Sequence, residues 1–201
     1  MRDFSPDNVP PFLEVISQKR FDFREVLAIN KAYFCAWSVH FNQFRMDGSA
    51  YIQHPIAMTR IAMNEFNIYN SELNITLILH DTDEPSIIPF FNSGLRVLFG
   101  KKIATNNHLL TKTDSNKKTY LKAIAQSMYW IVILSKLIDR MHNMRTLERT
   151  SSEFQKKQAT ETRKYFLKLC YTLAKVIPEE YKEIPTKIHI ELATWCEHYG
   201  C

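Results

Sequence analysis

The 201-residue sequence is poor in glycine and has no apolar run long enough to cross a bilayer. Only 4 residues are glycine, well below the usual share of about 7 %, which disfavours a β-protein rich in tight turns. The longest uncharged runs, 32–44 and 123–135, are shorter than the roughly 20 residues that a membrane-spanning helix needs. The first residues include Arg2, Asp3 and Asp7 and no apolar segment. We therefore expect no secretory signal, no membrane partner and a cytoplasmic protein.

Motifs for several ligand classes are also missing. The sequence has no glycine-rich phosphate loop and no basic motif interleaved with aromatic residues, so no nucleic-acid partner is expected. Cys35, Cys170, Cys196 and Cys201 do not have the spacing of a zinc site. In a cytoplasmic protein we expect them to be reduced thiols.

The charge is unevenly distributed along the chain. Residues 1–100 hold 8 basic and 11 acidic side chains, whereas residues 101–201 hold 18 basic and 10 acidic side chains, a net charge of +8. A basic half suits an anionic ligand such as a polyphosphate. Composition alone favours the alternative, in which these charges lie on solvated helix faces.

Apolar residues recur at three- and four-residue steps through most of the chain, which predicts helices. Loops are expected at 82–95, which holds Pro85, Pro89 and Gly94, and at the polar stretch 111–119. The expected helices cover 23–41, 55–66, 71–81, 97–110, 120–147 with a break near 128–130, 153–176, and a last segment after Pro185. The sequence therefore predicts an all-α protein of about eight helices.

Four side chains in this pattern are suited to holding a metal ion. His80 and Asp81 are adjacent near an expected helix end, and His54 begins the preceding helix, just before Pro55. Asp139 lies in a mostly apolar stretch, where an ionised carboxylate is costly unless it is paired or bound to metal. A structural ion pair of Asp139 with Lys136 or Arg140 is the alternative.

Two imidazoles and two carboxylates form an N₂O₂ donor set. Without thiolates, such a set favours Mn²⁺, Mg²⁺ or Fe²⁺ over structural zinc. Two open coordination positions on the ion would then hold water and a phosphate oxygen.

The residues around these ligands resemble the N-terminal hydrolase domain of RelA/SpoT proteins, within the HD superfamily of metal-dependent phosphohydrolases. The resemblance covers roughly residues 26 to 175, and its most specific part is the string 136–147, which departs from the family pattern only at Ile138 and Met141. Further matching residues are Ala32-Tyr33, Ala36, His40, Gln43, Arg45, Gly48, Tyr51-Ile52, His54-Pro55, Leu79-His80-Asp81-Thr82, Phe99-Gly100, Thr111-Lys112 and Glu161-Thr162.

The resemblance implies an HD-domain helical bundle with one Mn²⁺. It implies removal of the 3′-pyrophosphate from the guanosine tetra- and pentaphosphate alarmones ppGpp and pppGpp. By position, His54, His80, Asp81 and Asp139 match the metal ligands, and Glu84 matches a catalytic acid. Arg45, Asn143 and Thr146 match residues that hold the guanosine.

The expected domain organisation follows from the same resemblance. Residues 1–22 are predicted to be an N-terminal extension, and residues 23–177 the HD-type hydrolase domain. Residues 178–201 are predicted to be a C-terminal helix packed on that domain. The chain resembles a stand-alone alarmone hydrolase.

Several positions depart from the family pattern. Pro85 replaces the second acid that follows the His-Asp pair, and Asp83 is the residue able to substitute for it. Met46 replaces a lysine near the expected guanosine site. Asn42 and Ala50 replace a glycine and a proline, which predicts a changed loop before His54. In addition, Phe166 replaces a tyrosine.

These departures leave two alternatives to alarmone hydrolysis. An HD hydrolase with this sequence could act on another nucleotide, such as NADPH or a nucleoside phosphate, since Met46 and the altered loop change the nucleotide site. A degenerate domain could instead bind the alarmone without turnover, and Pro85 favours this alternative.

Overall fold

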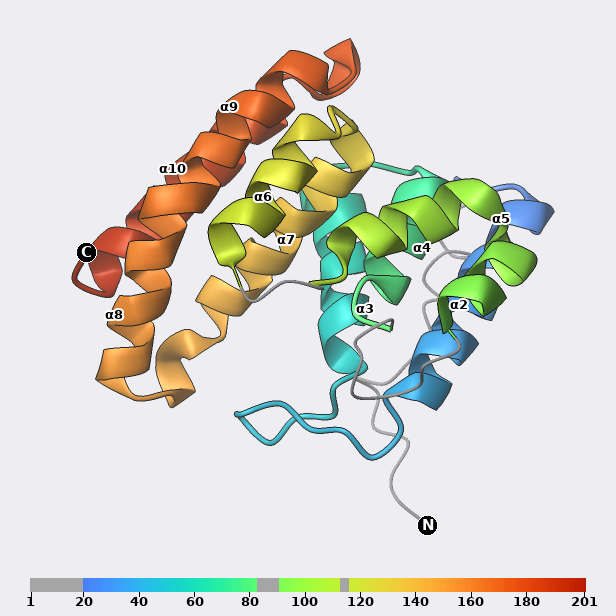
Figure 1. The fold of residues 1–201 in the computed structure, drawn as a ribbon, viewed down its shortest axis with the longest axis horizontal. Coiled ribbons are helices and arrows are strands. Elements are labelled where there is room, and N and C mark those ends of the chain that lie inside the picture. Colours follow the sequence, from blue (N-terminus) through green and yellow to red (C-terminus); the bar gives the residue numbers. More distant parts are fainter. Residues whose placement is uncertain (1–19, 83–90, 113–115) are drawn as a thin grey trace. The chain divides into compact units, whose positions relative to one another are not determined.

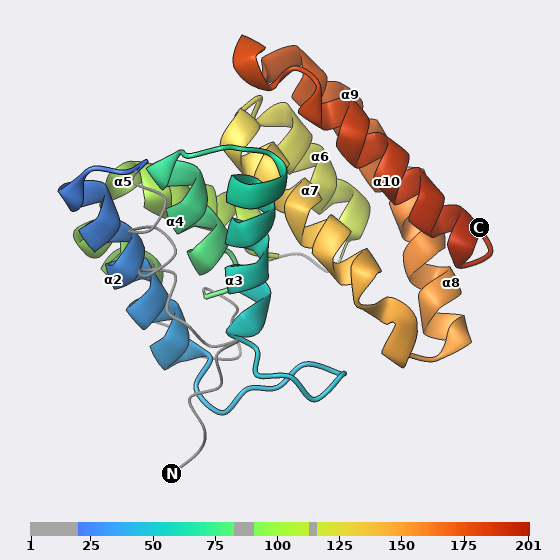
Figure 2. The same ribbon diagram turned by 180° about the vertical axis from the view of Figure 1, so that it is seen from behind.

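The computed structural model describes residues 20–82, 91–112 and 116–201 (Figures 1 and 2), and every regular element in these ranges is helical. The exception to helix is one isolated antiparallel bridge between Phe44 and Ala50. The all-α prediction is confirmed. The α-helices are α2 (Phe23–Val39), α3 (Gln53–Arg60), α4 (Ser71–Leu79), α5 (Phe91–Leu110), α6 (Lys117–Gln126), α7 (Trp130–Arg145), α8 (Ser152–Glu161), α9 (Leu167–Val176) and α10 (Ile184–His198).

The described residues form two compact units. The first contains α2 to α5, in residues 20–45, 49–82 and 91–111, and the second contains α6 to α10, in residues 116–201 with 46–48 and 112. Short π-helices extend two of the α-helices. The segment η2 (Ile61–Glu65) continues α3, and η4 (Thr162–Phe166) joins α8 to α9.

Polar caps set the start of the helices in the first unit. Asp22 caps α2 in a reciprocal capping box, accepting from the Glu25 backbone N–H at 2.9 Å while Glu25 accepts from the Asp22 N–H at 3.0 Å. Asn70 caps α4 by accepting from the Leu73 N–H at 2.9 Å. Helix α4 therefore begins at Ser71, as the predicted range 71–81 has it, with Asn70 supplying the oxygen that reaches the free donor.

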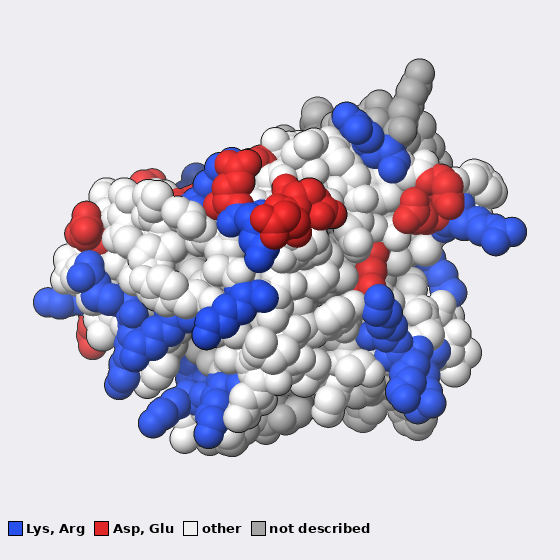
Figure 3. Space-filling model, turned by 90° about the horizontal axis from the view of Figure 1, so that it is seen from above, with Lys and Arg blue, Asp and Glu red and all other residues white. Residues whose placement is uncertain are grey.

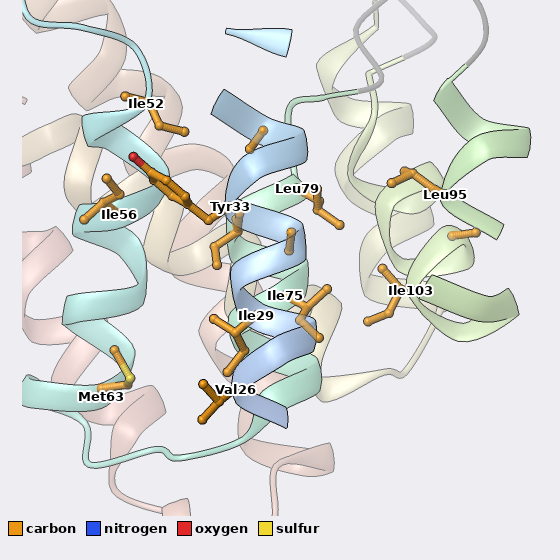
Figure 4. Packing of buried hydrophobic residues seen from close by; sticks show 14 residues of the cluster. Val26, Ile29, Tyr33, Ile52, Ile56, Met63, Ile75, Leu79, Leu95 and Ile103 are labelled. Carbon is orange, nitrogen blue, oxygen red and sulfur yellow. The ribbon is translucent and has the colours of Figure 1, made fainter. Parts of the chain in front are cut away.

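Helix α4 is the centre of the first unit. All of its residues from Leu73 to Leu79 are buried, and a helix that is apolar on every side has neighbours on every side. It packs against α2, α3 and α5. Figure 4 shows this core, in which Tyr33 extends from α2 toward Ile56 on α3. This packing fixes α3 and the end of α4 in one rigid core.

Two helix starts in the first unit differ from the sequence prediction. Helix α3 begins at Gln53, so Pro55 is its third residue and not its first. Helix α5 begins at Phe91, so residues 91–95 are helical and not loop. Gly100 interrupts α5 with φ 82° and ψ 172°, a conformation that glycine adopts without a steric penalty. The residues 83–90 of the predicted loop lie outside the described residues.

The second unit is built on α7 and α10. Helix α10 packs against α7, α8 and α9, and α7 also packs against α9 and α6. The predicted break between two helices is confirmed, because Met128, with φ 50°, separates α6 from α7. Pro185 lies in the first turn of α10. Backbone N–H groups in a first turn have no partner within the helix, so the N–H that proline lacks costs no hydrogen bond there. The predicted domain boundaries at residues 22 and 177 stay a prediction.

Two predictions from composition can be compared with the described helices. None of these helices is both long enough and apolar enough to span a membrane. The four cysteines are free thiols, and burial raises the pKa of Cys170 to about 12. Cys170 is therefore a packing residue in the second unit.

The first-unit core predicts the cost of truncating one side chain. Ile78 on α4 is 1 % exposed, so Ile78→Ala leaves a cavity among α2, α3 and α5. We expect the free energy of unfolding to fall by about 2–5 kcal/mol, measured by urea denaturation. The matched control is Leu27→Ala on the exposed side of α2 (Leu27 is 51 % exposed), which should change it by less than about 0.5 kcal/mol. Equal losses in both variants would contradict this account of the core.

Candidate metal centre

Three of the four predicted metal ligands meet in the first unit. His54 lies in the first turn of α3, and His80 and Asp81 follow directly after α4. One potential ligand atom from each lies within 4.8 Å of the others. His54 and His80 are each 2 % exposed, and Asp81 is partly exposed. The packing of α3 against α4 therefore brings together side chains that are 26 positions apart in the sequence.

The hydrogen bonds of His80 determine where its ring can bind a cation. Its Nδ1 lies 2.9 Å from the carbonyl oxygen of Leu77, which can only accept, so Nδ1 carries a proton. Its Nε2 lies 2.9 Å from Asp81 Oδ2, and its ring centroid lies 5.1 Å from that of His54. The second ring nitrogen thus faces the other two candidate ligands.

This arrangement fits a bound cation. In a neutral His80 the Nε2 lone pair would face a carboxylate oxygen, and two acceptors at that distance repel each other. A proton on Nε2 or a metal ion between the groups removes the repulsion. Two buried imidazoles and one carboxylate are a donor set for a divalent transition metal, so these three residues fit the metal that the HD-type family implies.

Tyr51 supports the carboxylate of this site. Its hydroxyl donates to Asp81 Oδ2 at 2.5 Å. Its ring is stacked on His40, with centroids 4.4 Å apart, and His40 Nδ1 lies 2.9 Å from Gln43 Oε1. Burial lowers the pKa of His40, outweighing the hydrogen bond to Gln43 and the charge of Asp81. His40 is the buried core histidine that its position predicts, and Tyr51 orients Asp81.

The end of α4 is also held from α5. Asn107 is fully buried, and its side-chain amide donates to the Leu79 carbonyl oxygen. The Thr82 hydroxyl donates to the same carbonyl at 2.7 Å. These bonds satisfy a carbonyl that the helix end would leave without an intrahelical partner. Sequence reasoning had missed the roles of Tyr51 and Asn107, because both depend on contacts between distant segments.

The fourth predicted ligand, Asp139, lies on α7 in the second unit. The residue is 7 % exposed. Lys136 Nζ lies 2.8 Å from Oδ2, and the Asn143 amide donates to Oδ1 at 2.6 Å. The ion pair with Lys136, which the sequence left open as an alternative, is therefore present. Both carboxylate oxygens have partners within α7, which keep the buried charge compensated.

Arg140, next to Asp139, joins α7 to η4 and α8. Its Nη1 donates to Gln158 Oε1 at 2.6 Å, and its Nη2 lies 3.9 Å from Glu161 Oε2. Its guanidinium lies 4.1 Å from the centroid of the Phe166 ring. Burial lowers the pKa of Arg140, although Asp139 and Glu161 oppose this effect. Phe166, where the resembling family has tyrosine, thus supplies the ring face under a buried cation.

The predicted guanosine-binding residues are divided between the units. Arg45 is in the first unit, where its backbone N–H donates to the Ser49 carbonyl at 2.8 Å and closes the loop 45–49. Asn143 lies on α7 and Thr146 directly after it, in the second unit. The Thr146 hydroxyl donates to the His142 carbonyl at 3.0 Å.

The predicted catalytic acids Asp83 and Glu84, and the substitution at Pro85, lie outside the described residues. The loop before His54 is described, and Asn42 has φ 61° there. Glycine is the usual residue in this left-handed conformation and asparagine tolerates it well. The change from the family's glycine to Asn42 is therefore compatible with the local backbone.

Comparison with known proteins finds related sequences and related solved structures. No family model matches the chain. It is 33 % identical over 175 residues to a GTP pyrophosphokinase of Myxococcus xanthus and 30 % identical over 161 residues to the bifunctional (p)ppGpp synthase/hydrolase SpoT of Escherichia coli. A probable guanosine-3′,5′-bis(diphosphate) 3′-pyrophosphohydrolase of Mycoplasma genitalium is 32 % identical over 171 residues.

These matches cover 80 %, 74 % and 79 % of this chain and 22 %, 22 % and 24 % of the three relatives. The chain thus spans about a quarter or less of the length of the curated relatives that it matches. A solved structure, described as a metazoan orthologue of SpoT that hydrolyses ppGpp, matches this chain with a TM-score of 0.59 and 16 % sequence identity. The match covers 86 % of this chain and 96 % of the solved chain. That likeness shows the fold. The sequence matches support an HD-type hydrolase domain of the RelA/SpoT kind in this chain.

Proposed function

We propose that the protein is a divalent-metal-dependent 3′-pyrophosphohydrolase that converts ppGpp and pppGpp to GDP and GTP plus pyrophosphate. The observation that carries this proposal is the meeting of His54, His80 and Asp81 in one buried cluster. The named activity of relatives such as the Mycoplasma protein supports the substrate. Guanosine tetra- and pentaphosphate are therefore the proposed substrates.

The proposed metal ligands are His54, His80, Asp81 and Asp139, and the proposed ion is Mn²⁺. Carboxylates and imidazoles without thiolates favour this ion, with Mg²⁺ and Fe²⁺ as the next choices. A divalent ion held by these residues supplies positive charge for a phosphate oxygen and lowers the pKa of a coordinated water.

Neighbouring side chains hold two of the proposed metal ligands, Asp81 and Asp139, in place. Tyr51, which donates to Asp81 at 2.5 Å, keeps that carboxylate aimed at His80. Lys136 and Asn143, which contact the two oxygens of Asp139, hold that carboxylate in position. Such outer hydrogen bonds orient metal ligands and tune their basicity.

Hydrolysis adds water across the bond between phosphorus and the 3′ oxygen of the ribose. The water oxygen bonds to phosphorus, the bond to the 3′ oxygen breaks, and the ribose hydroxyl leaves with one proton. Glu84, with Asp83 beside it, is the proposed base that takes a proton from the water. Arg45, Asn143 and Thr146 are proposed to hold the guanosine.

The direct test is pyrophosphate release from ppGpp with and without added Mn²⁺. We expect release only with metal. Binding of ppGpp without any release would support the non-catalytic alternative favoured by Pro85. Faster turnover of NADPH or a nucleoside phosphate in parallel assays would support the other hydrolase alternative.

The cluster predicts that one imidazole is essential. His80→Ala removes a proposed ligand, and we expect ppGpp hydrolysis to fall by more than about 100-fold, with weaker Mn²⁺ binding in calorimetry. His108→Ala, an exposed histidine of α5 in the same unit, is the matched control and should keep both properties. Unchanged Mn²⁺ affinity in His80→Ala would contradict the assignment.

The support from Tyr51 predicts a smaller effect. Tyr51→Phe removes the hydroxyl that donates to Asp81 and keeps the ring that stacks on His40. We expect the apparent Mn²⁺ affinity or the metal-dependent rate to fall about 10–100-fold, with no loss of thermal stability comparable to that of a core variant. Tyr171→Phe, at a 62 % exposed position, serves as the control. An identical Mn²⁺ titration for Tyr51→Phe and the parent protein would disprove the positioning role.

The proposed base predicts a separation of catalysis from binding. Glu84→Gln keeps the size of the side chain and removes the proton acceptor, so kcat should fall about 10²–10⁴-fold. Mn²⁺ binding should stay within about twofold of the parent value, because Glu84 is not a proposed ligand. Full activity in Glu84→Gln would contradict the assignment of Glu84 as the base.

A further inference from the structure

A lysine-rimmed groove lies within the second unit, between α6 and the segment formed by η4 and α9. Figures 1 and 2 show α6 beside this segment, and Figure 3 shows that basic side chains gather in groups on the molecular surface. The groove is lined by Lys118, Leu121, Lys122, Ala125, Lys164, Tyr165, Lys168, Leu169 and Thr172. None of these residues is a proposed metal ligand or a proposed guanosine-binding residue.

The two rims of the groove carry the same charge pattern. Lys118 and Lys122 lie four residues apart on α6, and Lys164 and Lys168 lie four residues apart on the facing segment. All four are exposed, and no acidic residue lines the groove. Residues four apart on a helix lie on the same face, so each rim presents a pair of positive charges separated by one helical turn.

The floor between the rims is apolar. Leu121 is 6 % exposed and Leu169 is 3 % exposed, and both form part of the lining. Ala125 and the ring of Tyr165 are partly exposed and complete the floor. The rims and the floor together form an open groove about two helical turns long, roughly 10 Å at a rise of 1.5 Å per residue.

The neutral polar groups of the lining favour one kind of occupant. Sites for small nucleotides combine apolar walls with several convergent polar groups that fix the base. Here only the hydroxyls of Thr172 and Tyr165 are neutral polar groups, and the positive charges stand on opposite rims. A helix with apolar side chains on one face and carboxylates on both flanks complements such a groove in shape and in charge.

We propose that the groove between α6 and α9 binds an acidic amphipathic helix of a partner protein. Leucine-like side chains of that helix pack on Leu121, Ala125 and Leu169. Its glutamates or aspartates pair with the lysines of the two rims. These exposed ion pairs contribute mainly to the association rate and to partner choice, so binding weakens as the salt concentration rises.

The test uses a fluorescein-labelled 14-residue peptide with leucines on one helical face and glutamates on both flanks. Its binding to the full chain is measured by fluorescence anisotropy at low and high salt. We expect Lys122→Glu with Lys168→Glu, one reversal on each rim, to weaken binding at least tenfold. The same peptide with lysine in place of glutamate should bind the parent protein at least tenfold more weakly than the glutamate peptide.

Two controls separate this groove from net charge and from catalysis. Lys156→Glu with Lys157→Glu reverses two exposed charges on α8, outside the groove lining, and should change the affinity less than twofold. His80→Ala, with its altered metal centre, should bind the peptide as the parent protein does. Peptide binding at the groove is therefore tested independently of alarmone hydrolysis at the metal centre.

Three results would overturn the proposal. The first is equal loss of binding in the α6–α9 and α8 double variants. The second is equal affinity for a peptide of the same composition whose leucines are spread around the helix. The third is GTP binding that is lost with the same groove reversals, which would make the groove a nucleotide site.

Discussion

The packing of α3 against α4 is the contact on which the candidate centre depends. It brings His54 to the end of α4, where His80 and Asp81 follow in sequence. Both imidazoles are buried, and the lower dielectric of a buried position strengthens their electrostatic interaction with the Asp81 carboxylate. Tyr51 and Asn107 then hold Asp81 and the last carbonyl of α4 from two different segments. The arrangement of His54, His80 and Asp81 is thus a property of the first-unit core.

Asp139, the buried carboxylate of the second unit, is held by contacts within its own helix. Asp139 is compensated within α7 by Lys136 and Asn143. Arg140 anchors the same helix to α8 through Glu161 and to η4 through Phe166. A buried charge without partners would be strongly destabilising, so these contacts allow α7 to carry an ionised group in an apolar stretch. The local network explains why the string around Asp139 is rich in polar residues amid a buried helix.

Sequence reasoning predicted the helices because the apolar period is a local pattern, and three of the four predicted metal ligands lie together. The apolar period predicted α2 and the break before α7, and the His-Asp pair with a preceding histidine predicted the cluster. The start of α5 was missed because Asn92 and Gly94 are residue types typical of turns. Tyr51 and Asn107 were missed because their partners lie 30 and 28 positions away in the chain, and no spacing rule describes such contacts.

The central claim is that His54, His80, Asp81 and Asp139 hold one divalent ion. The most direct test is a crystal structure of the protein grown with MnCl₂, with anomalous scattering used to locate the metal. This account predicts one manganese peak in contact with all four side chains. A strong peak elsewhere, or the four side chains without manganese at a saturating concentration, would contradict it.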